Sequence, residues 1–355
     1  MEFLIRRDDL HATRFEQDGA DPEIADGQAL LAVDSFGLTS NNITYAVFGD
    51  AMNYWEFFPA GDGWGRMPVW GFAEVAASKA RGVDVGSRLY GYLPPSSHLV
   101  VRPDRANERG FTDASPHRAE LPSAYQGYRR IEADPAYDAG RENEQILFWP
   151  LFYTSFLIDD FLADEGTFGA DTVVLSSASS KTAIIAAYLL AQRGGIELIG
   201  LTSARNQQFV TELGIYDEVV GYDETDSLPR EQAVYVDISG DAKVRREVHE
   251  HYGDRLAHSA AVGMTHWDKL AAGAGELTGP KPTFFFAPNR IRKRGADWGT
   301  AKLEENVAAA WHPFAEWSQR WLRVEPVSGD EQIEEAYLAL LDGEIDPRVG
   351  HVVSL

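Results

Sequence analysis

The stretch DTVVLSSASSKTAIIAAYLLAQRGGIELIGL, Asp171–Leu201, decides the fold. Asp171–Leu175 is a short apolar run of the kind that is buried on both faces of a parallel sheet, and Ile196–Leu201 is a second one. Between them lie a turn of small polar residues and the apolar segment Ala183–Ala191, which reads as a helix ending at Gly194–Gly195. The order strand, helix, strand predicts two parallel strands joined by a right-handed crossover.

The same rhythm continues along the chain. A helix is predicted over Gln207–Leu213, and short strands are predicted over Glu218–Val220 and Ala233–Ile238. This alternation is typical of a doubly wound parallel sheet, in which ligands bind at the carboxyl ends of the strands. We therefore predict an α/β fold.

Other elements are expected on either side of this region. Before it, we expect a helix capped by Thr154 or Ser155. After it, we expect an apolar run at Thr283–Ala287 and a helix with Leu303, Val307 and Trp311 that is interrupted at Pro313. The chain then continues with a helix that starts at a capping box of Ser328 and Glu331 and ends at Gly343, and with a strand at His351–Leu355.

The first 100 residues indicate a small β-rich domain. Short strands are predicted at Ala29–Val33, Gly71–Ala76 and Leu89–Leu93, separated by turn residues. Residues 101–148 are rich in charge and proline, which predicts a long insertion or loop. Within this insertion, the tyrosines of the denser patch Leu121–Tyr128 suggest packing against the domain or, equally, a lid over the cleft.

Composition excludes several classes of protein. The 355 residues contain no cysteine, which excludes disulfides, iron–sulfur clusters, thiolate zinc sites and cysteine nucleophiles. The net charge of −23 argues against nucleic-acid binding. The amino terminus is charged and no long apolar window is present, so we expect a cytoplasmic protein without a membrane span.

Six segments together resemble the medium-chain dehydrogenase/reductase superfamily in its zinc-free, quinone-oxidoreductase-like branch. The resembling segments are Ala29–Gly49 (ALLAVDSFGLTSNNITYAVFG), Gly71–Gly91 with GFAEV and GVDVGSRLYG, Tyr153–Phe161, Glu212–Val220 (ELGIYDEVV), Val236–Gly240 (VDISG) and Val327–Leu355. The resemblance implies a GroES-like catalytic domain at 1–148, a Rossmann-type nucleotide-binding domain at 149–290 and a return to the catalytic domain at 291–355. It also implies a homodimer.

Two departures from the superfamily pattern bear on chemistry. The positions that carry zinc ligands in other members read Gly37–Ser40 and Trp70–Ala73 here, so we expect no metal. The turn after the first parallel strand is Ser176–Thr182 and lacks the glycines that let a backbone approach a pyrophosphate. Serine hydroxyls and a lysine at a helix N-terminus can still hold a phosphate, although the same serines can simply cap the helix.

The resemblance then implies NADPH as cofactor. After the second strand there is an arginine but no acid, which favours the 2′-phosphate of NADPH over NADH, although a helix cap and an exposed arginine would look the same. The expected cofactor-binding residues are Ser177, Ser179, Ser180, Lys181, Thr182, Ser203 and Arg205.

The segment that faces substrate in the superfamily contains Asn41, Asn42 and Tyr45, which we expect to be catalytic by hydrogen-bonding a carbonyl as hydride arrives. Thr44, Arg290 and Arg292 are expected to bind substrate. A packed turn and a solvated basic surface are the alternatives.

The expected function is zinc-independent, NADPH-dependent reduction of quinones or α,β-unsaturated carbonyl compounds, with a small molecule as the only partner besides a second copy. The alternative is a degenerate, non-catalytic member that binds a ligand or another protein.

Overall fold

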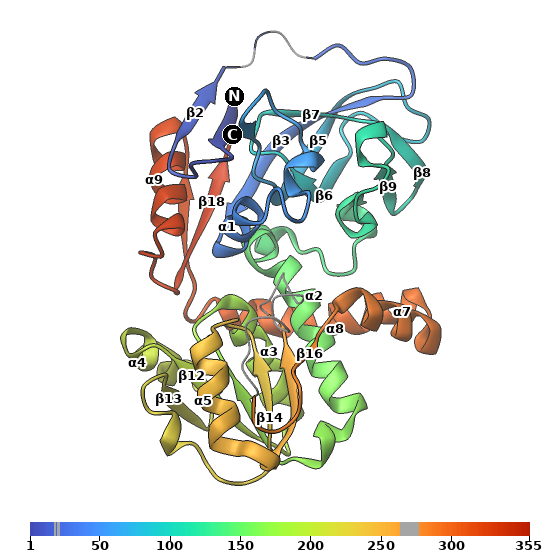
Figure 1. The fold of residues 1–355 in the computed structure, drawn as a ribbon. Helices are drawn as coiled ribbons and strands as arrows, with labels where there is room; N and C mark the ends of the chain where they lie inside the picture. The colour runs from blue at the N-terminus through green and yellow to red at the C-terminus, as the bar shows by residue number, and fades with distance from the viewer. Residues whose placement is uncertain (18, 20–21, 263–276) are drawn as a thin grey trace. The chain divides into compact units, whose positions relative to one another are not determined.

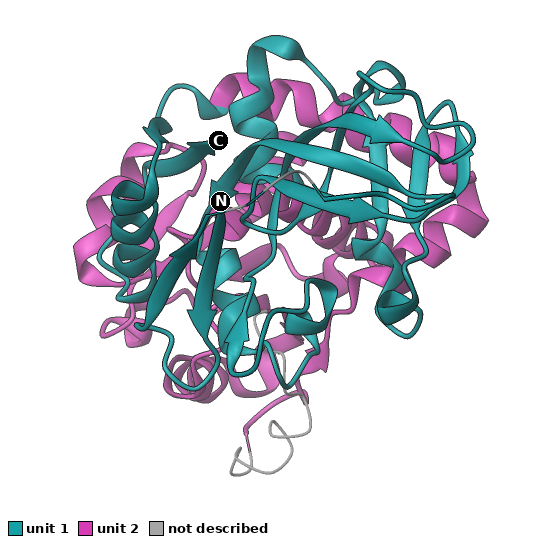
Figure 2. Ribbon diagram, turned by 90° about the horizontal axis from the view of Figure 1, so that it is seen from above, with its two compact units in different colours: residues 1–149, 318–355 teal, residues 150–317 magenta. Residues whose placement is uncertain are grey.

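The computed structural model describes residues 1–17, 19, 22–262 and 277–355. These residues form two compact units, shown in different colours in Figure 2. Unit 1 consists of Met1–Trp149 and Ser318–Leu355, and unit 2 of Pro150–Trp317. Unit 2 extends to Trp317, past residue 291, where the predicted return to the first domain begins.

Unit 1 is built mainly on antiparallel strands (Figure 1), whereas β17 pairs in parallel with β18. One sheet has the strand order β17-β18-β3-β5-β6-β10-β9-β8, with β7 also paired to β3, and a smaller sheet has the order β2-β1-β4. The strands are β1 (Glu2–Arg6), β2 (Thr13–Glu16), β3 (Ala29–Leu38), β4 (Trp64–Gly65), β5 (Val69–Ser78), β6 (Arg88–Leu93), β7 (His98–Val101), β8 (Pro103–Asn107), β9 (Gly110–Asp113), β10 (Gly127–Arg130), β17 (Arg323–Val327) and β18 (Val349–Ser354).

The core of unit 1 lies on β3, β5 and β6, together with α9 (Asp330–Leu341). Phe36 of β3 and Tyr337 of α9 are completely buried. Gly71 of β5 is required at its position, because a Cβ atom there would lie 2.0 Å from the carbonyl oxygen of Ser35. This close approach fixes the pairing of β3 with β5.

Residues 101–148 are not the loop that their composition predicts. They supply β8, β9 and β10, which extend the large sheet beyond β6. The segment compensates for its few apolar residues with buried polar pairs. The guanidinium of Arg118 is 1% exposed and lies 3.1 Å from the Asp113 carboxylate. A sequence pattern that counts apolar residues cannot detect such a pair.

Unit 2 contains a six-stranded parallel sheet in the order β13-β12-β11-β14-β15-β16. Every residue of β11 and β14 is buried, as expected for strands covered on both faces. The elements are β11 (Thr172–Leu175), α3 (Lys181–Arg193), β12 (Glu197–Thr202), α4 (Gln207–Glu212), β13 (Glu218–Gly221), β14 (Ala233–Asp237), α5 (Ala242–Tyr252), β15 (Leu256–Ala261), β16 (Thr283–Phe284), α7 (Ala287–Trp298) and α8 (Thr300–Ser318). The predicted α/β fold class is thereby confirmed.

Two prolines do not end helices as their positions suggest. Helix α2 (Glu142–Asp164) runs through Pro150 and starts well before Thr154, and α8 runs through Pro313. Aromatic packing holds α8 on both sides of its proline, since Phe152 lies 5.2 Å from Trp311 and 5.4 Å from Phe314 between ring centroids. These contacts offset the lost backbone hydrogen bond.

Helix caps also differ from the prediction. Ser155 lies inside α2 and donates its hydroxyl to the carbonyl of Thr182, 2.9 Å away. Helix α9 begins after Gly329, whose φ of +76° suits glycine, and no side chain caps it. The capping box expected at Ser328 is therefore absent.

One helical segment among the described residues, Ala139–Asp164, is long and apolar enough to cross a membrane by length and composition alone. Of its most apolar window, 61% is buried within the protein. This burial is that of a core helix.

Candidate functional site

The turn between β11 and α3 is fixed to the strands beside it. The amides of Ser176 and Ala178 donate to backbone carbonyls of β14 and β12, at 3.1 and 2.9 Å. Ser177 has a φ of +54°, a left-handed conformation that favours glycine, and its amide donates to the hydroxyl of Tyr222 at 3.0 Å. One backbone amide of the turn is thus already hydrogen-bonded to the side chain of Tyr222.

The start of α3 keeps two backbone donors open. Ser180 is the N-cap, and its hydroxyl oxygen accepts from the amide of Ala183 at 3.3 Å. Within the described part of the chain, no acceptor is bonded to the amides of Ser179 and Thr182. Lys181 is the first residue of the helix. These groups give the turn the character of an anion site at a helix N-terminus.

The end of β12 meets the same turn. The side-chain amide of Asn206 donates to the hydroxyl oxygen of Ser179 at 3.0 Å, which leaves the Ser179 proton available to a ligand. Ser203 and the exposed Arg205 flank this contact. The structure therefore brings all seven predicted cofactor-binding residues to the carboxyl ends of β11 and β12.

Asp237, the last residue of β14, lies at the carboxyl end of the same sheet and bonds several groups there. It was not among the predicted site residues. Its carboxylate accepts from the Ser176 hydroxyl and the Gly240 amide, both at 3.0 Å. It also accepts from the guanidinium of Arg245 at 2.6 Å, and both side chains are buried. The available signal was an acid at the end of an apolar strand. Asp237 ties the turn to the loop after β14.

In unit 1, Asn42 has a structural role in helix α1 (Ser40–Val47). Its side-chain oxygen accepts from the amide and the hydroxyl of Thr39, at 2.8 and 2.9 Å, and its side-chain nitrogen donates to the carbonyl of Pro68 at 3.0 Å. Thr44 donates its hydroxyl to the carbonyl of Ser40, one turn earlier in the helix. Both side chains thus stabilise the start of α1.

Tyr45 is positioned by two donors. Its hydroxyl oxygen accepts from the Asn41 side chain at 2.8 Å and from the indole nitrogen of Trp70 at 3.2 Å. Burial raises the pKa of Tyr45, so the phenol stays protonated at neutral pH. Because both lone pairs of the oxygen are used, the O–H proton is the group left to interact with a ligand.

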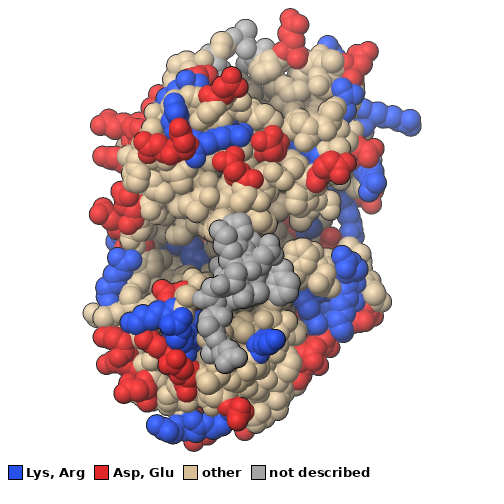
Figure 3. Space-filling view, viewed as in Figure 1, with Lys and Arg blue, Asp and Glu red and all other residues tan. Residues whose placement is uncertain are grey.

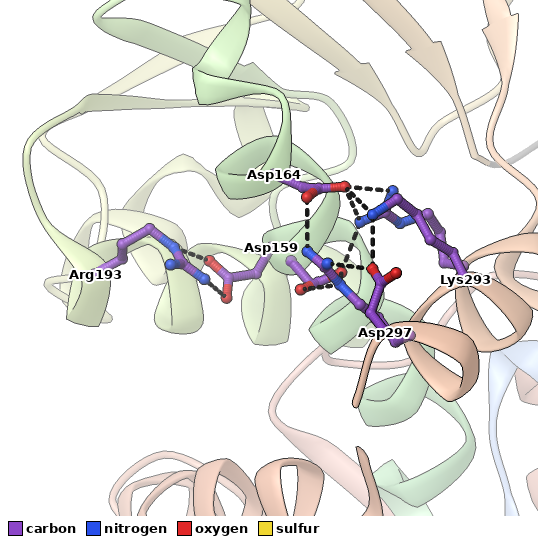
Figure 4. Close-up of polar contacts among 8 residues, drawn as sticks. Asp159, Asp164, Arg193, Lys293 and Asp297 are labelled. Carbon is purple, nitrogen blue, oxygen red and sulfur yellow. Dashed lines mark hydrogen bonds and ion pairs between the residues drawn. The ribbon is translucent and has the colours of Figure 1, made fainter. Parts of the chain in front are cut away.

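An ion-pair network joins α7 to α2 (Figure 4), and one of the two predicted substrate residues on α7, Arg290, belongs to it. Arg290 donates to Asp160 at 2.7 Å and to Asp164 at 3.0 Å, and Arg294 pairs with the same two carboxylates. Arg290 is only 9% exposed, so its charge serves to fasten α7 to α2. Arg292 is exposed and bonds an asparagine of its own helix.

Acid should weaken this network through Asp164. Its bond to Lys293, with help from the two arginines, lowers the pKa of Asp164 to about 2 from 3.8. A carboxyl with a lowered pKa stabilises the fold above its unfolded pKa, and that contribution is lost as pH falls from 3.8 through about 2. In urea titrations, Asp164→Asn should destabilise the protein at pH 7 and the difference should narrow by pH 3. Equal differences at both pH values would contradict this role, and the exposed Asp171→Asn is the matched control.

Acidic and basic side chains are interspersed over the face shown in Figure 3. In the chain apart from 18, 20–21 and 263–276, no three His, Asp or Glu residues gather in a way that could hold a metal ion.

A family model described as "Protein of unknown function (DUF2855)" matches residues 36–346. The chain belongs to this family. The comparison with curated protein sequences finds no match.

Solved structures share the fold of this DUF2855 protein at low sequence identity. CurA from Vibrio vulnificus in complex with NADPH is 16% identical, with 97% of this chain and 93% of that chain covered and a TM-score of 0.57. The quinone oxidoreductase from Coxiella burnetii is 13% identical, with 100% and 98% covered and a TM-score of 0.58. YhdH from E. coli K-12 with bound NADPH is 15% identical, with 100% and 99% covered and a TM-score of 0.56. At these identities the likeness establishes the fold, a GroES-like unit with a Rossmann-type unit.

Proposed function

We propose that this DUF2855 protein is a zinc-independent, NADPH-dependent reductase of quinones or α,β-unsaturated carbonyl compounds, in the zinc-free branch of the medium-chain dehydrogenase/reductase superfamily. The observation that carries the proposal is the pair of open amides at Ser179 and Thr182, beside Lys181, at the carboxyl edge of the parallel sheet. Solved structures with the same fold that contain NADPH support it.

The proposed cofactor residues divide by role. Ser179 and Thr182 bind the pyrophosphate through their open amides, the Ser179 hydroxyl is a third donor, and Lys181 supplies a positive charge. Arg205 binds the 2′-phosphate, and Asp237 holds the turn in place through Ser176. Ser177, Ser180 and Ser203 shape the turn around these groups. The bound nicotinamide supplies a hydride to the acceptor.

Tyr45 acts on the acceptor. Its O–H hydrogen-bonds the acceptor carbonyl and stabilises the negative charge that develops on this oxygen. Asn41 and Trp70 hold the phenol oxygen, so that the proton points away from both donors. We also propose a cytoplasmic homodimer with no nucleic-acid or membrane partner.

One contact favours the second candidate, a non-catalytic binding protein. The hydroxyl of Tyr222 already accepts from the Ser177 amide, a donor that a glycine-rich turn would offer to phosphate. Burial raises the pKa of Tyr222, however, so the hydroxyl keeps its proton and can itself donate to a phosphate oxygen.

The two candidates differ in turnover and in coenzyme preference. We expect oxidation of NADPH, followed at its nicotinamide absorbance, with 1,4-naphthoquinone or 2-cyclohexenone as acceptor. Arg205→Ala should abolish the preference for NADPH over NADH, while the control Arg230→Ala, an exposed residue just before β14 at the opposite edge of the sheet, should keep it. An unchanged preference in Arg205→Ala would remove the 2′-phosphate role, and a lack of turnover with all acceptors would favour the binding protein.

A further inference from the structure

Unit 1 contains an aromatic cluster around Tyr45 that the proposed function does not explain. We call it the tyrosine cluster. Its buried members are Tyr45, Tyr54, Phe57, Phe58 and Tyr92, and Phe48, Trp70, Leu99, Leu121 and Tyr125 are packed against it and partly buried. Four tyrosines in one apolar cluster are an unusual choice, because phenylalanine fills such space without a hydroxyl to satisfy.

The hydroxyl of Tyr92 is a buried polar group inside this aromatic cluster. Tyr92 is completely buried, and its hydroxyl has no hydrogen-bond partner among the described residues. Its ring centroid lies 5.4 Å from that of Tyr45 and 5.0 Å from that of Trp70, its cross-strand neighbour on β5. A buried, unpaired hydroxyl costs stability, so a ligand that accepts its proton is a physical reason for its presence.

Tyr125 covers the cluster from the segment 119–125. Its ring centroid lies 4.8 Å from that of Tyr92, 6.0 Å from that of Tyr54 and 6.2 Å from that of Tyr45. It also lies 5.5 Å from the ring centroid of Phe57 and 6.1 Å from that of Trp70. Tyr125 is therefore the member of the cluster that contacts three other tyrosines and comes from outside the strands and helix that carry them.

The segment 119–125, which carries Tyr125, is held by hydrogen bonds near its ends, and most of its residues are exposed to solvent. Arg118 is fixed by Asp113, and the side chain of Gln126 donates to the carbonyls of Arg118 and Leu121, both at 2.8 Å. Between these anchors, residues 119, 120 and 122–124 are exposed, and the backbone hydrogen bonds of 119–125 stay within 116–126. Side-chain packing is what keeps the segment against the cluster.

We propose that the tyrosine cluster is the acceptor-binding subsite in a closed state, in which Tyr125 is the specificity-determining cover and the Tyr92 hydroxyl is the group that binds the acceptor carbonyl alongside Tyr45. This inference rests on the proposed function. The acceptor takes the place of the Tyr125 ring, so a flat cyclic acceptor of similar size is preferred over an open-chain one. The carbonyl oxygen of the acceptor then receives two hydrogen bonds, one from Tyr45 and one from Tyr92.

The cover is tested without coenzyme by nitration with tetranitromethane and peptide mass spectrometry. Tyr45 and Tyr92 should be unreactive in the wild type and should become reactive in Tyr125→Ala. The control Tyr137→Ala removes a partly buried ring from the same 101–148 segment, outside the cluster, and should leave both residues protected. Protection of Tyr45 and Tyr92 in Tyr125→Ala equal to that in the wild type would overturn the cover.

The Tyr92 hydroxyl is tested by Tyr92→Phe, which deletes an unpaired group and should leave Tm unchanged or higher. We expect kcat/KM for 2-cyclohexenone to fall at least tenfold, with NADPH affinity unchanged. Affinity for 1,4-naphthoquinone, measured without NADPH by quenching of tryptophan fluorescence, should also fall at least tenfold. Unchanged quinone affinity would overturn the role of Tyr92 even in a protein that shows no turnover.

The third test of the proposal measures specificity for the acceptor. The ratio of kcat/KM for 2-cyclohexenone to that for the open-chain trans-2-hexenal should fall about tenfold in Tyr125→Ala and be kept in Tyr137→Ala. An equal change for both acceptors would refute a specificity role. Failure of NADPH to bind would instead refute the proposed function, and the nitration and quinone-binding results would still decide the inference.

Discussion

Replacing Tyr45 by phenylalanine is expected to lower kcat for enone reduction by about 100-fold, the typical cost of losing one donor to a developing oxyanion. The affinity for NADPH should be unchanged, because the residues proposed to bind it all lie in unit 2. Steady-state kinetics with 2-cyclohexenone and a separate NADPH titration measure the two quantities.

The matched control for this experiment is Tyr137→Phe. Tyr137 lies outside the tyrosine cluster, and its hydroxyl donates to the carboxylate of Glu142 at 2.8 Å. We expect Tyr137→Phe to keep kcat within a few-fold of the wild type. If Tyr45→Phe retains full kcat, the phenol does not assist the reaction and its buried hydrogen bonds are structural.

Asp237→Asn is expected to lower the free energy of unfolding by about 3 kcal/mol or more, since breaking a buried ion pair by removing the charge of one partner is strongly destabilising. The partner is Arg245, whose buried guanidinium lies 2.6 Å from the carboxylate of Asp237. The measurement is urea unfolding of the purified protein.

A double variant separates the charge from the packing. Asp237→Asn combined with Arg245→Met removes both charges and should recover part of the lost stability. The exposed pair Lys302 and Glu305 on α8 provides a control, because breaking it should cost less than about 1 kcal/mol. A loss of less than about 1 kcal/mol in Asp237→Asn would show that the Asp237–Arg245 pair does not stabilise the carboxyl end of the sheet.

The parallel sheet of unit 2 could be predicted from the sequence because its strands are short apolar runs between polar turns. Asp171–Leu175 and Ala233–Ile238 are examples, and β11 and β14 match them within two residues. The polar turn at Ser176–Thr182 followed from the same pattern, since it lies between a buried strand and an apolar helix.

The pairing of charges could not be predicted. Arg290 reads as a free cation in the sequence, but its partners Asp160 and Asp164 lie 126 to 130 residues away. Arg118 and Asp113 similarly turn a polar segment into part of a sheet. Such contacts depend on tertiary structure, which a local pattern of residue types does not contain.

Two residues at strand ends could not be assigned to the candidate site from the sequence either. Tyr222 and Asp237 each end or follow a predicted strand, yet nothing in the sequence shows that both reach the Ser176–Ser177 turn. The parallel order of β13, β12, β11 and β14 brings them to one edge. A search for polar residues at every strand end would have found both.

Isothermal titration calorimetry tests most directly whether the glycine-free turn of this DUF2855 protein binds NADPH. We predict one binding site per chain, an affinity at least tenfold weaker in Lys181→Glu, and an unchanged affinity in the control Lys243→Glu on the surface of α5. Absence of NADPH binding to the wild type at millimolar concentration, in a protein that unfolds cooperatively, would contradict the proposed binding.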